Sequence, residues 1–305
     1  MLVDCNGSTE SEWGKKRAES GHPEPFNLKY IGIGNEDLIS DIFKERFLII
    51  YNSITEKYPD ITVIGTVGPF FEGSDYVEGW KFATELEIEI VDEHYYQKPG
   101  WFVNNQDFYD KYDRSRSKVY LGEYASRGNS LYNALSEAIY LTAIERNGDV
   151  VQMASYAPLL ARDHFTQWRT DLIFFNGTTI KPTPNYEVQK LFGQNSGNIY
   201  INSTVQLSNK NIAVRKRIGV SIVRENQSGD IIVKFVNLLP VDINSSINFE
   251  GLKNIKESVL QTTLKGNPDD RRVLPETKTI SLNDISKLSI PAYSVSVIRF
   301  KIDLD

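Results

Sequence analysis

The stretch YIGIGNED, residues 30–37, decides the fold of this 305-residue chain. Its β-branched and aromatic residues predict a buried strand that begins at Tyr30, and the polar pair Asn35 and Glu36 follows directly after that strand. From residue 37 to residue 58 the apolar residues recur at spacings of three and four, which predicts an amphipathic helix ending before Pro59. A strand that leads through a polar turn into a helix is the beginning of a β/α unit.

The same alternation continues through the first two thirds of the chain. Further strands are predicted at ITVIGTVGP (61–69), IEIVDEHYY (88–96), KVYLGEYA (118–125) and DVVQMASYAPLL (149–160). Helices are predicted between them at 76–86, 105–112 and 130–148. Alternating strands and helices indicate a parallel sheet with right-handed crossovers, and we count five β/α units.

After about residue 195 the pattern changes to short strands separated by turn residues, without a helix of any length. The predicted strands are 198–207, 218–226, 230–239, 246–251, 257–264, 278–282 and 293–302. Many short strands with turns between them are typical of an antiparallel β-sandwich. We place the boundary at GQNSG (193–197), which gives one domain over residues 1–194 and a second over residues 195–305.

Composition narrows the function classes. The net charge is −6 and the pI is near 5.3, which argues against nucleic acid as the partner, because such proteins carry a basic footprint. No apolar run is long enough to span a membrane, and residues 1–20 lack the apolar stretch of a signal peptide, so the compartment stays open. The three histidines show no metal-binding spacing and Cys5 is the single cysteine, so we predict neither a metal site nor a cofactor.

Polar side chains follow three of the predicted strands. Glu36, His94 with Tyr96, and Glu123 all lie at strand ends, where a parallel α/β barrel carries its active site. Two carboxyl groups across a cleft are what glycoside hydrolysis requires, one protonated and one ionised. A glutamate at a strand end can also be a helix cap or a loop salt bridge, but three such ends in one sheet favour the hydrolase interpretation.

Several segments together resemble the α-L-arabinofuranosidases of glycoside hydrolase family 51. They are GHPEPFNLKYIGIGNED (21–37), DEHYY (92–96) and LGEYA (121–125), with WGKKRAESGHPEPF (13–26), NYEVQKLFGQNSG (185–197) and PAYSVSVIRFKI (291–302). The resemblance implies a retaining, exo-acting enzyme with a (β/α)8 TIM barrel and a C-terminal β-sandwich. It equates the five predicted units with barrel strands four to eight.

The resemblance also implies roles for individual residues. Glu36 would be the general acid/base, and Asn35 before it would bind the sugar 2-hydroxyl or the nucleophile. Glu123 would be the nucleophile that forms the covalent arabinosyl intermediate. His94 and Tyr96 would orient the nucleophile and line the sugar subsite, and Tyr95 could take the place of Tyr96.

Other interpretations remain for some of these positions. Asn35 could cap the following helix, and His94 could be a core histidine with satisfied hydrogen bonds. Trp168 could stack on a sugar or, as we favour, pack against the sandwich. Residues 162–164 follow the last predicted β/α strand, and we expect them to form a surface salt-bridge cluster.

The chain departs from the family pattern in one respect: it contains no counterpart of barrel strands one to three. We therefore expect a C-terminal portion that pairs with a missing N-terminal half or forms a homo-oligomer, and that has little or no activity alone. The expected substrates are arabinofuranosyl-containing oligosaccharides and polysaccharides such as arabinoxylan and arabinan. The alternatives are a truncated, non-catalytic carbohydrate-associated module and another two-glutamate TIM-barrel glycosidase, such as a β-xylosidase or endoglucanase.

Overall fold

A computed structural model of the chain describes residues 5–250 and 255–302. The chain divides into two compact units, and the division crosses strands β3 (Ile90–Gln97) and β4 (Lys118–Ser126). One unit runs to His94 and includes Arg114–Tyr120, and the other comprises Tyr95–Asp113 and the chain from Leu121 onward.

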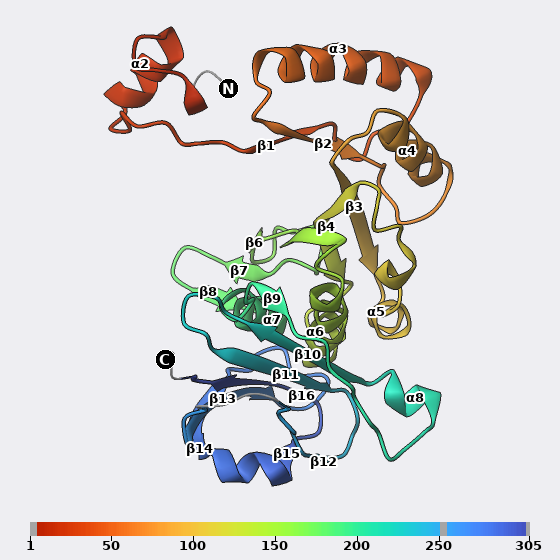
Figure 1. Cartoon of the computed structure of the whole chain (residues 1–305), viewed down its shortest axis with the longest axis vertical. Coiled ribbons are helices and arrows are strands. Elements are labelled where there is room, and N and C mark those ends of the chain that lie inside the picture. Colours follow the sequence, from red (N-terminus) through yellow and green to blue (C-terminus); the bar gives the residue numbers. More distant parts are fainter. Residues whose placement is uncertain (1–4, 251–254, 303–305) are drawn as a thin grey trace. The chain divides into compact units, whose positions relative to one another are not determined.

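The first unit is built from β/α units. Strand β1 (Tyr30–Ile33) pairs in parallel with β2 (Thr62–Thr66), and β2 pairs in parallel with β3 (Ile90–Gln97) (Figure 1). Helices α3 (Asp41–Lys57) and α4 (Ser74–Glu85) connect these strands, as alternating periodicity predicts. Helix α2 (Glu12–Glu19) precedes them. Apolar contacts join the two helices, for example the rings of Phe47 on α3 and Phe82 on α4 at 5.4 Å.

The sheet continues with β4 (Lys118–Ser126) and β5 (Val151–Tyr156). Among the described residues its strand order is β1-β2-β3-β4-β5, the sequential order of a partial (β/α)8 barrel. All five strands begin within two residues of the expected position. The prediction of about five consecutive β/α units is therefore confirmed.

One predicted helix was wrong. Residues 105–112 do not form a regular helix; α5 (Pro99–Asn104) comes earlier, and only a short 3₁₀ turn, η1 (Tyr109–Lys111), follows. Pro99 lies at the start of α5, where its fixed φ angle suits the first turn of a helix. The aromatic rings of the 105–112 segment instead pack in the core, where the Tyr109 hydroxyl bonds that of Tyr95 at 2.9 Å.

Helix α6 (Leu131–Arg146) is buried over most of its length and lies at the centre of the second unit. It packs against α7 (Pro184–Gly193) and against β10 (Ile218–Arg224) of the sandwich. The contact with β10 is so close that a Cβ on Gly219 would lie 2.6 Å from Ile139 Cγ1, so the position requires glycine. A small three-stranded sheet follows β5, formed by β6 (Leu160–Arg162), β7 (Ile173–Phe175) and β8 (Ile180–Pro182).

The C-terminal part is the predicted antiparallel sandwich. Its larger sheet has the order β14-β13-β16-β11-β10-β9, and β12 pairs with β15 in a second sheet. The bounds are β9 (Ile199–Tyr200), β10 (Ile218–Arg224), β11 (Ile231–Asn237), β12 (Ile243–Ser245), β13 (Ser258–Lys265), β14 (Glu276–Ser281), β15 (Leu288–Ile290) and β16 (Ser294–Phe300). Side chains such as Val233, Leu288 and Phe300 form its core.

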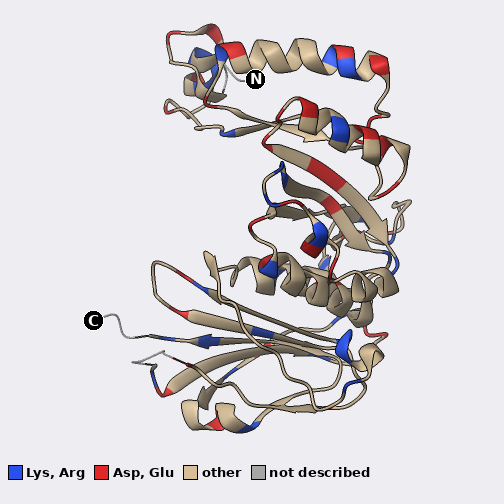
Figure 2. Ribbon diagram, turned by 45° about the vertical axis from the view of Figure 1, so that its right-hand side comes forward, with Lys and Arg blue, Asp and Glu red and all other residues tan. Residues whose placement is uncertain are grey.

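Two details of the predicted sandwich were wrong. Short helices occur at α8 (Ile212–Arg215) and η2 (Leu282–Lys287), where Asn211 and Ser281 cap the first turns. The strand predicted at 246–251 lies earlier, as β12, and residue 251 is outside the described residues. Figure 2 shows acidic and basic residues interspersed over the surface elements. Within the described residues no helix combines the length and apolar character needed to cross a bilayer.

Candidate active site

Glu36 lies in a tight turn after β1. Gly34 has φ +90°, and a Cβ there would come within 2.6 Å of Asp37 Oδ2, so only glycine fits. The Asp37 carboxylate accepts a hydrogen bond from the Asn35 backbone N–H at 2.7 Å. Glu36 itself has φ +53°, an uncommon conformation for a non-glycine residue that is typical of functional turns. The turn thus presents Glu36 directly at the end of the strand.

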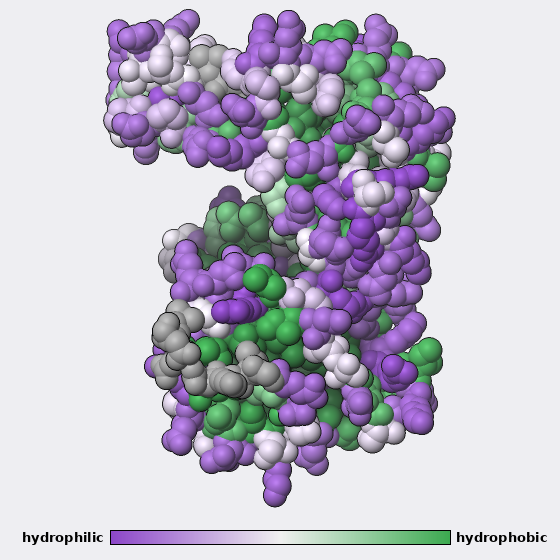
Figure 3. All heavy atoms as spheres, in the orientation of Figure 1, coloured by the Kyte–Doolittle hydropathy of each residue, from purple (hydrophilic) through white to green (hydrophobic). Residues whose placement is uncertain are grey.

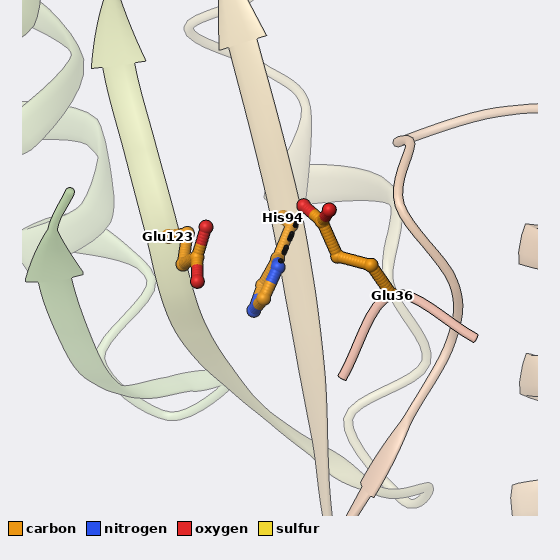
Figure 4. A group of neighbouring side chains, drawn as sticks. All are labelled: Glu36, His94 and Glu123. Carbon is orange, nitrogen blue, oxygen red and sulfur yellow. Dashed lines mark hydrogen bonds and ion pairs between the residues drawn. The ribbon is translucent and has the colours of Figure 1, made fainter. Parts of the chain in front are cut away.

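Glu36 contacts a buried histidine. His94 on β3 is 3% exposed, and its Nδ1 lies 3.1 Å from Glu36 Oε1 (Figure 4). Its other ring nitrogen, Nε2, lies 3.1 Å from Asp92 Oδ2. A neutral imidazole carries one N–H, so the second contact needs one more proton, on the ring or on a carboxyl group. The His94 ring thus lies between two carboxyl groups, those of Glu36 and Asp92.

Glu123 on β4 has a different partner. The Tyr96 hydroxyl donates to Glu123 Oε2 at 2.6 Å, a length typical of hydrogen bonds to an ionised carboxylate. The Tyr96 ring in turn meets Trp168 edge to face, with 4.7 Å between centroids. Tyr95 is not exchangeable with Tyr96, because its buried hydroxyl bonds those of Tyr109 and Tyr140 in the core.

A buried acid that sequence reasoning missed supports the end of β4. Glu137 on α6 is fully buried, and its Oε1 accepts hydrogen bonds from the Ser126 N–H at 2.7 Å and from Asn185 Nδ2 at 2.8 Å. Burial raises the pKa of Glu137 to about 8. The Glu137 side chain thereby ties the chain three residues after Glu123 to α6 and α7. The sequence offers no signal for this role, since the contact joins elements distant in the chain.

Asp92 was also missed, although the sequence contained a usable signal. It precedes His94 by two residues on a strand, so both side chains project from the same face. A carboxylate and an imidazole ring can both bind divalent metals, but here Glu36 Oε1 and His94 Nδ1 contact each other at 3.1 Å.

The structure places the remaining candidates individually. Asn35 is not the helix cap, because the Ser40 hydroxyl accepts from the Phe43 N–H at the start of α3. Trp168 is 47% exposed and rests against Tyr96. In the 162–164 segment Asp163 pairs with Lys181, in line with the expected salt bridge.

Comparisons with known proteins agree with this geometry. The family model described as the α-L-arabinofuranosidase 1 domain matches residues 2–114, and the model of the α-L-arabinofuranosidase C-terminal domain matches residues 109–294. The chain is 50% identical over 197 residues to an extracellular exo-α-L-arabinofuranosidase of Streptomyces chartreusis, a match covering 65% of this chain and 24% of that protein. It is 32% identical to α-L-arabinofuranosidase 2 of Arabidopsis thaliana, over 81% of this chain and 36% of that protein.

Solved structures give the same assignment. An arabinose-bound MgGH51 α-L-arabinofuranosidase is 26% identical, with a TM-score of 0.85 over 99% of this chain and 50% of that chain. A Thermotoga maritima α-L-arabinofuranosidase, 18% identical, shares the fold with a TM-score of 0.75 over 99% of this chain and 72% of that one. The chain thus spans between a quarter and half of the length of the curated relatives it matches. It belongs to the α-L-arabinofuranosidases of glycoside hydrolase family 51.

Proposed function

We propose that this chain carries the catalytic residues of a retaining, exo-acting α-L-arabinofuranosidase. The observation that carries the proposal is the contrast between two glutamates. Glu36 lies within hydrogen-bond distance of a buried histidine that also contacts Asp92, whereas Glu123 accepts a short hydrogen bond from a tyrosine. One environment supplies a proton and the other stabilises a charge, which is the division of labour that glycoside hydrolysis needs.

The reaction proceeds in two displacements. The Glu123 carboxylate attacks the anomeric carbon while the Glu36 carboxyl group protonates the departing glycosidic oxygen. Glu36, now ionised, then removes a proton from a water molecule that releases arabinose from Glu123. Tyr96 holds the Glu123 oxygen that does not attack, and Asn35 binds the sugar 2-hydroxyl. The two displacements together retain the α configuration.

His94 and Tyr96 link the two acids through strand β3. They are two residues apart on one strand, so their side chains project from the same face with a spacing of about 6.6 Å along the strand. One of them contacts Glu36 and the other contacts Glu123. Strand β3 thus supplies a partner to each of the two carboxyl groups.

Hydrolysis of 4-nitrophenyl α-L-arabinofuranoside tests the proposal, with Glu56→Gln as an exposed control on α3. The described strands form an open sheet, so we expect slow turnover by the wild-type chain and use a high enzyme concentration. Glu123→Gln should lower kcat by about 10³-fold or more. Glu36→Gln should lose much less on a 2,4-dinitrophenyl substrate, because that leaving group needs no proton.

The stereochemistry of the product separates the mechanisms. Proton NMR early in the reaction should show α-arabinose as the first product, and β-arabinose would rule out double displacement. Full activity of Glu123→Gln would assign the hydrolysis to other residues. No turnover at all by the wild-type chain would favour a non-catalytic carbohydrate-associated module.

The proposed partners are glycans with terminal arabinofuranosyl groups, as in arabinoxylan and arabinan, and a further polypeptide at the first unit. Four apolar side chains on and beside α3 are strongly exposed: Leu38, Ile42, Ile49 and Ile50. Several of them line a hollow next to β1, at the end of the sheet order. In Figure 2 the middle of α3 carries no charged residue. An edge strand beside an apolar face invites pairing with another chain.

Light scattering tests whether this polypeptide is a second copy of the chain. A second copy predicts a mass that rises with concentration and falls to that of a monomer in Ile42→Asp. A constant monomeric mass would exclude a second copy as the partner.

A further inference from the structure

Strand β4 is held on the face opposite to the proposed nucleophile. Side chains alternate along a strand, so those of Tyr124 and Ser126 project away from the face that carries Glu123. Both residues are fully buried, and Ser126 is the last residue of the strand. On the other face the Glu123 carboxylate accepts the hydrogen bond of the Tyr96 hydroxyl at 2.6 Å. The place of this carboxylate therefore depends on how its two buried neighbours are fixed.

Both neighbours are connected to the same acid on α6. The Ser126 N–H donates to Glu137 Oε1 at 2.7 Å, and Asn185 Nδ2 donates to the same oxygen at 2.8 Å. The Tyr124 hydroxyl donates to Gln189 Oε1 at 2.9 Å, and Gln189 Nε2 donates in turn to Glu137 Oε2 at 3.4 Å. Glu137 thus reaches β4 at one position directly and at a second through the side chain of Gln189.

Helix α6 is a rigid support for this acid. Leu131 and all residues from 133 to 144 are buried, and the helix packs against α5, α7 and β10. Figure 3 shows apolar residues gathered where β9 and β10 lie in Figure 1, and β10 is the strand that covers α6. An acid on a helix enclosed in this way keeps a fixed position, so the hydrogen bonds that it accepts fix β4 as well.

The chemistry of the contact requires an acceptor and does not require a charge. Within the part of the chain that the structure describes, the hydrogen-bond partners of Glu137 are the amide groups of Ser126, Asn185 and Gln189. None of these carries a positive charge, and burial raises the pKa of Glu137 to about 8. A neutral side chain with a carbonyl oxygen at the same place can therefore do the same work, whereas an aliphatic side chain of similar size cannot.

We propose that Glu137 is a positioning residue for the proposed nucleophile: it holds the end of β4 so that the Glu123 carboxylate stays at the Tyr96 hydroxyl. The proposal rests on the function proposed above, which gives the place of Glu123 a catalytic consequence. A displacement of a reacting group by about 1 Å can cost about 10²-fold in rate. Glu123 forms its bond to the anomeric carbon only as the reaction proceeds, so the effect falls on kcat and not on KM.

Kinetics of three variants separate positioning from support of the fold. Glu137→Leu should lower kcat for 4-nitrophenyl α-L-arabinofuranoside about 10²-fold and change KM by less than about threefold. Glu137→Gln keeps the carbonyl oxygen and should restore kcat to within about threefold of the wild type. Glu145→Gln is the matched control, because Glu145 is also largely buried on α6 but bonds Ser221 and Lys234 of the sandwich. It should lower stability and leave kcat unchanged. A loss confined to KM, equal losses of kcat in Glu137→Leu and Glu145→Gln, or no recovery in Glu137→Gln would overturn the proposal.

A spectroscopic measurement decides the question whether or not the chain turns over. The protein is labelled with ¹³C at the side-chain carboxyl carbon of glutamate, and the NMR signal of Glu123 is assigned by its absence in Glu123→Gln. This signal reports the hydrogen bond from Tyr96, so it should keep its chemical shift in Glu137→Gln and Glu145→Gln and move in Glu137→Leu. Gln189→Leu, which leaves the acid in place, should move it less and serves if Glu137→Leu does not fold.

The two measurements fail in different ways. An unmoved Glu123 signal in a folded Glu137→Leu, or in Gln189→Leu where the first variant does not fold, would overturn the positioning role. A signal that moves as expected in a wild-type background without turnover would support the positioning role and contradict only the proposed hydrolysis.

Discussion

Replacement of Glu137 by glutamine should change how the stability of this protein depends on pH. The carboxyl group is fully buried, and its pKa is raised from 4.5 to about 8 by burial, against the opposing effect of hydrogen bonds from Ser126, Asn185 and Gln189. At neutral pH the folded protein therefore keeps Glu137 protonated, while the unfolded chain ionises it. Glutamine resembles the protonated acid in being neutral and in offering a carbonyl oxygen as acceptor beside a donor group, here an NH2 with two N–H bonds.

The magnitude follows from linkage between protonation and folding. Below pH 4.5 both states are protonated, and Glu137 costs the protein nothing through ionisation. As the pH rises from 4.5 to about 8, Glu137 loses its proton in the unfolded chain but keeps it in the folded protein, so the free energy of unfolding falls. At 1.36 kcal/mol for each unit of pKa, the complete loss is about 5 kcal/mol. Glu137→Gln removes this loss.

Urea unfolding at pH values from 5 to 9 measures the effect. The free energy of unfolding should fall more steeply with pH in the wild type than in Glu137→Gln, and the difference should change by several kcal/mol across the range. Near pH 5 the two should be similar. Glu56→Gln, on the exposed face of α3, should follow the wild-type curve. Parallel curves for the wild type and Glu137→Gln would refute the reasoning, because they would show that Glu137 is equally ionised in both states.

Three further substitutions test the packing. Lys234→Met should lower the free energy of unfolding in urea by about 3–5 kcal/mol, because it leaves the mostly buried Glu145 without its cation at 2.6 Å; Lys234→Met with Glu145→Leu should recover most of the loss. Gly79→Ala should lower the melting temperature although alanine favours helices, since its Cβ would lie 2.7 Å from Val67 Cα; a higher melting temperature would contradict this contact. Ser40→Ala should cost about 1 kcal/mol in urea unfolding by removing the cap of α3, and no change would show that the cap is dispensable.

The strands of the sheet were predictable because their residues form short β-type runs between segments with helical periodicity. Residues 61–69 are a nearly continuous apolar run, as expected for a parallel strand covered on both faces. The helix predicted at 105–112 failed because its aromatic residues serve a core contact rather than a helical face. Periodicity reports that a residue is buried, but it does not tell which partner buries it.

Part of the candidate site was predictable from the position of its residues at strand ends. Glu36 and Glu123 were recognisable because a carboxyl group at the end of a strand costs free energy to bury unless it has hydrogen-bond partners. Glu137 lies in the middle of a strongly helical segment, where an acid is ordinary, and its importance comes from contacts to Ser126 and Asn185. Contacts between elements distant in the chain leave no local pattern in a single sequence.

Strand β3 carries the residues that contact both proposed catalytic glutamates. Asp92, His94 and Tyr96 alternate along it and therefore share one face. His94 contacts Glu36, and Tyr96 contacts Glu123. A single five-residue run thus supplies the proposed acid/base and the proposed nucleophile with their partners.

The residues between them occupy the opposite face and hold the strand in place. Glu93 accepts hydrogen bonds from the Tyr76 hydroxyl at 3.2 Å and from Trp80 Nε1 at 3.1 Å, both on α4. Tyr95 is buried in the aromatic core of the second unit. A shift of the strand by one residue would exchange its two faces. Glu93 and Tyr95 would then lose their partners and project into the site, and His94 would leave it. Because packing on one face fixes the register, the same packing fixes which side chains reach Glu36 and Glu123.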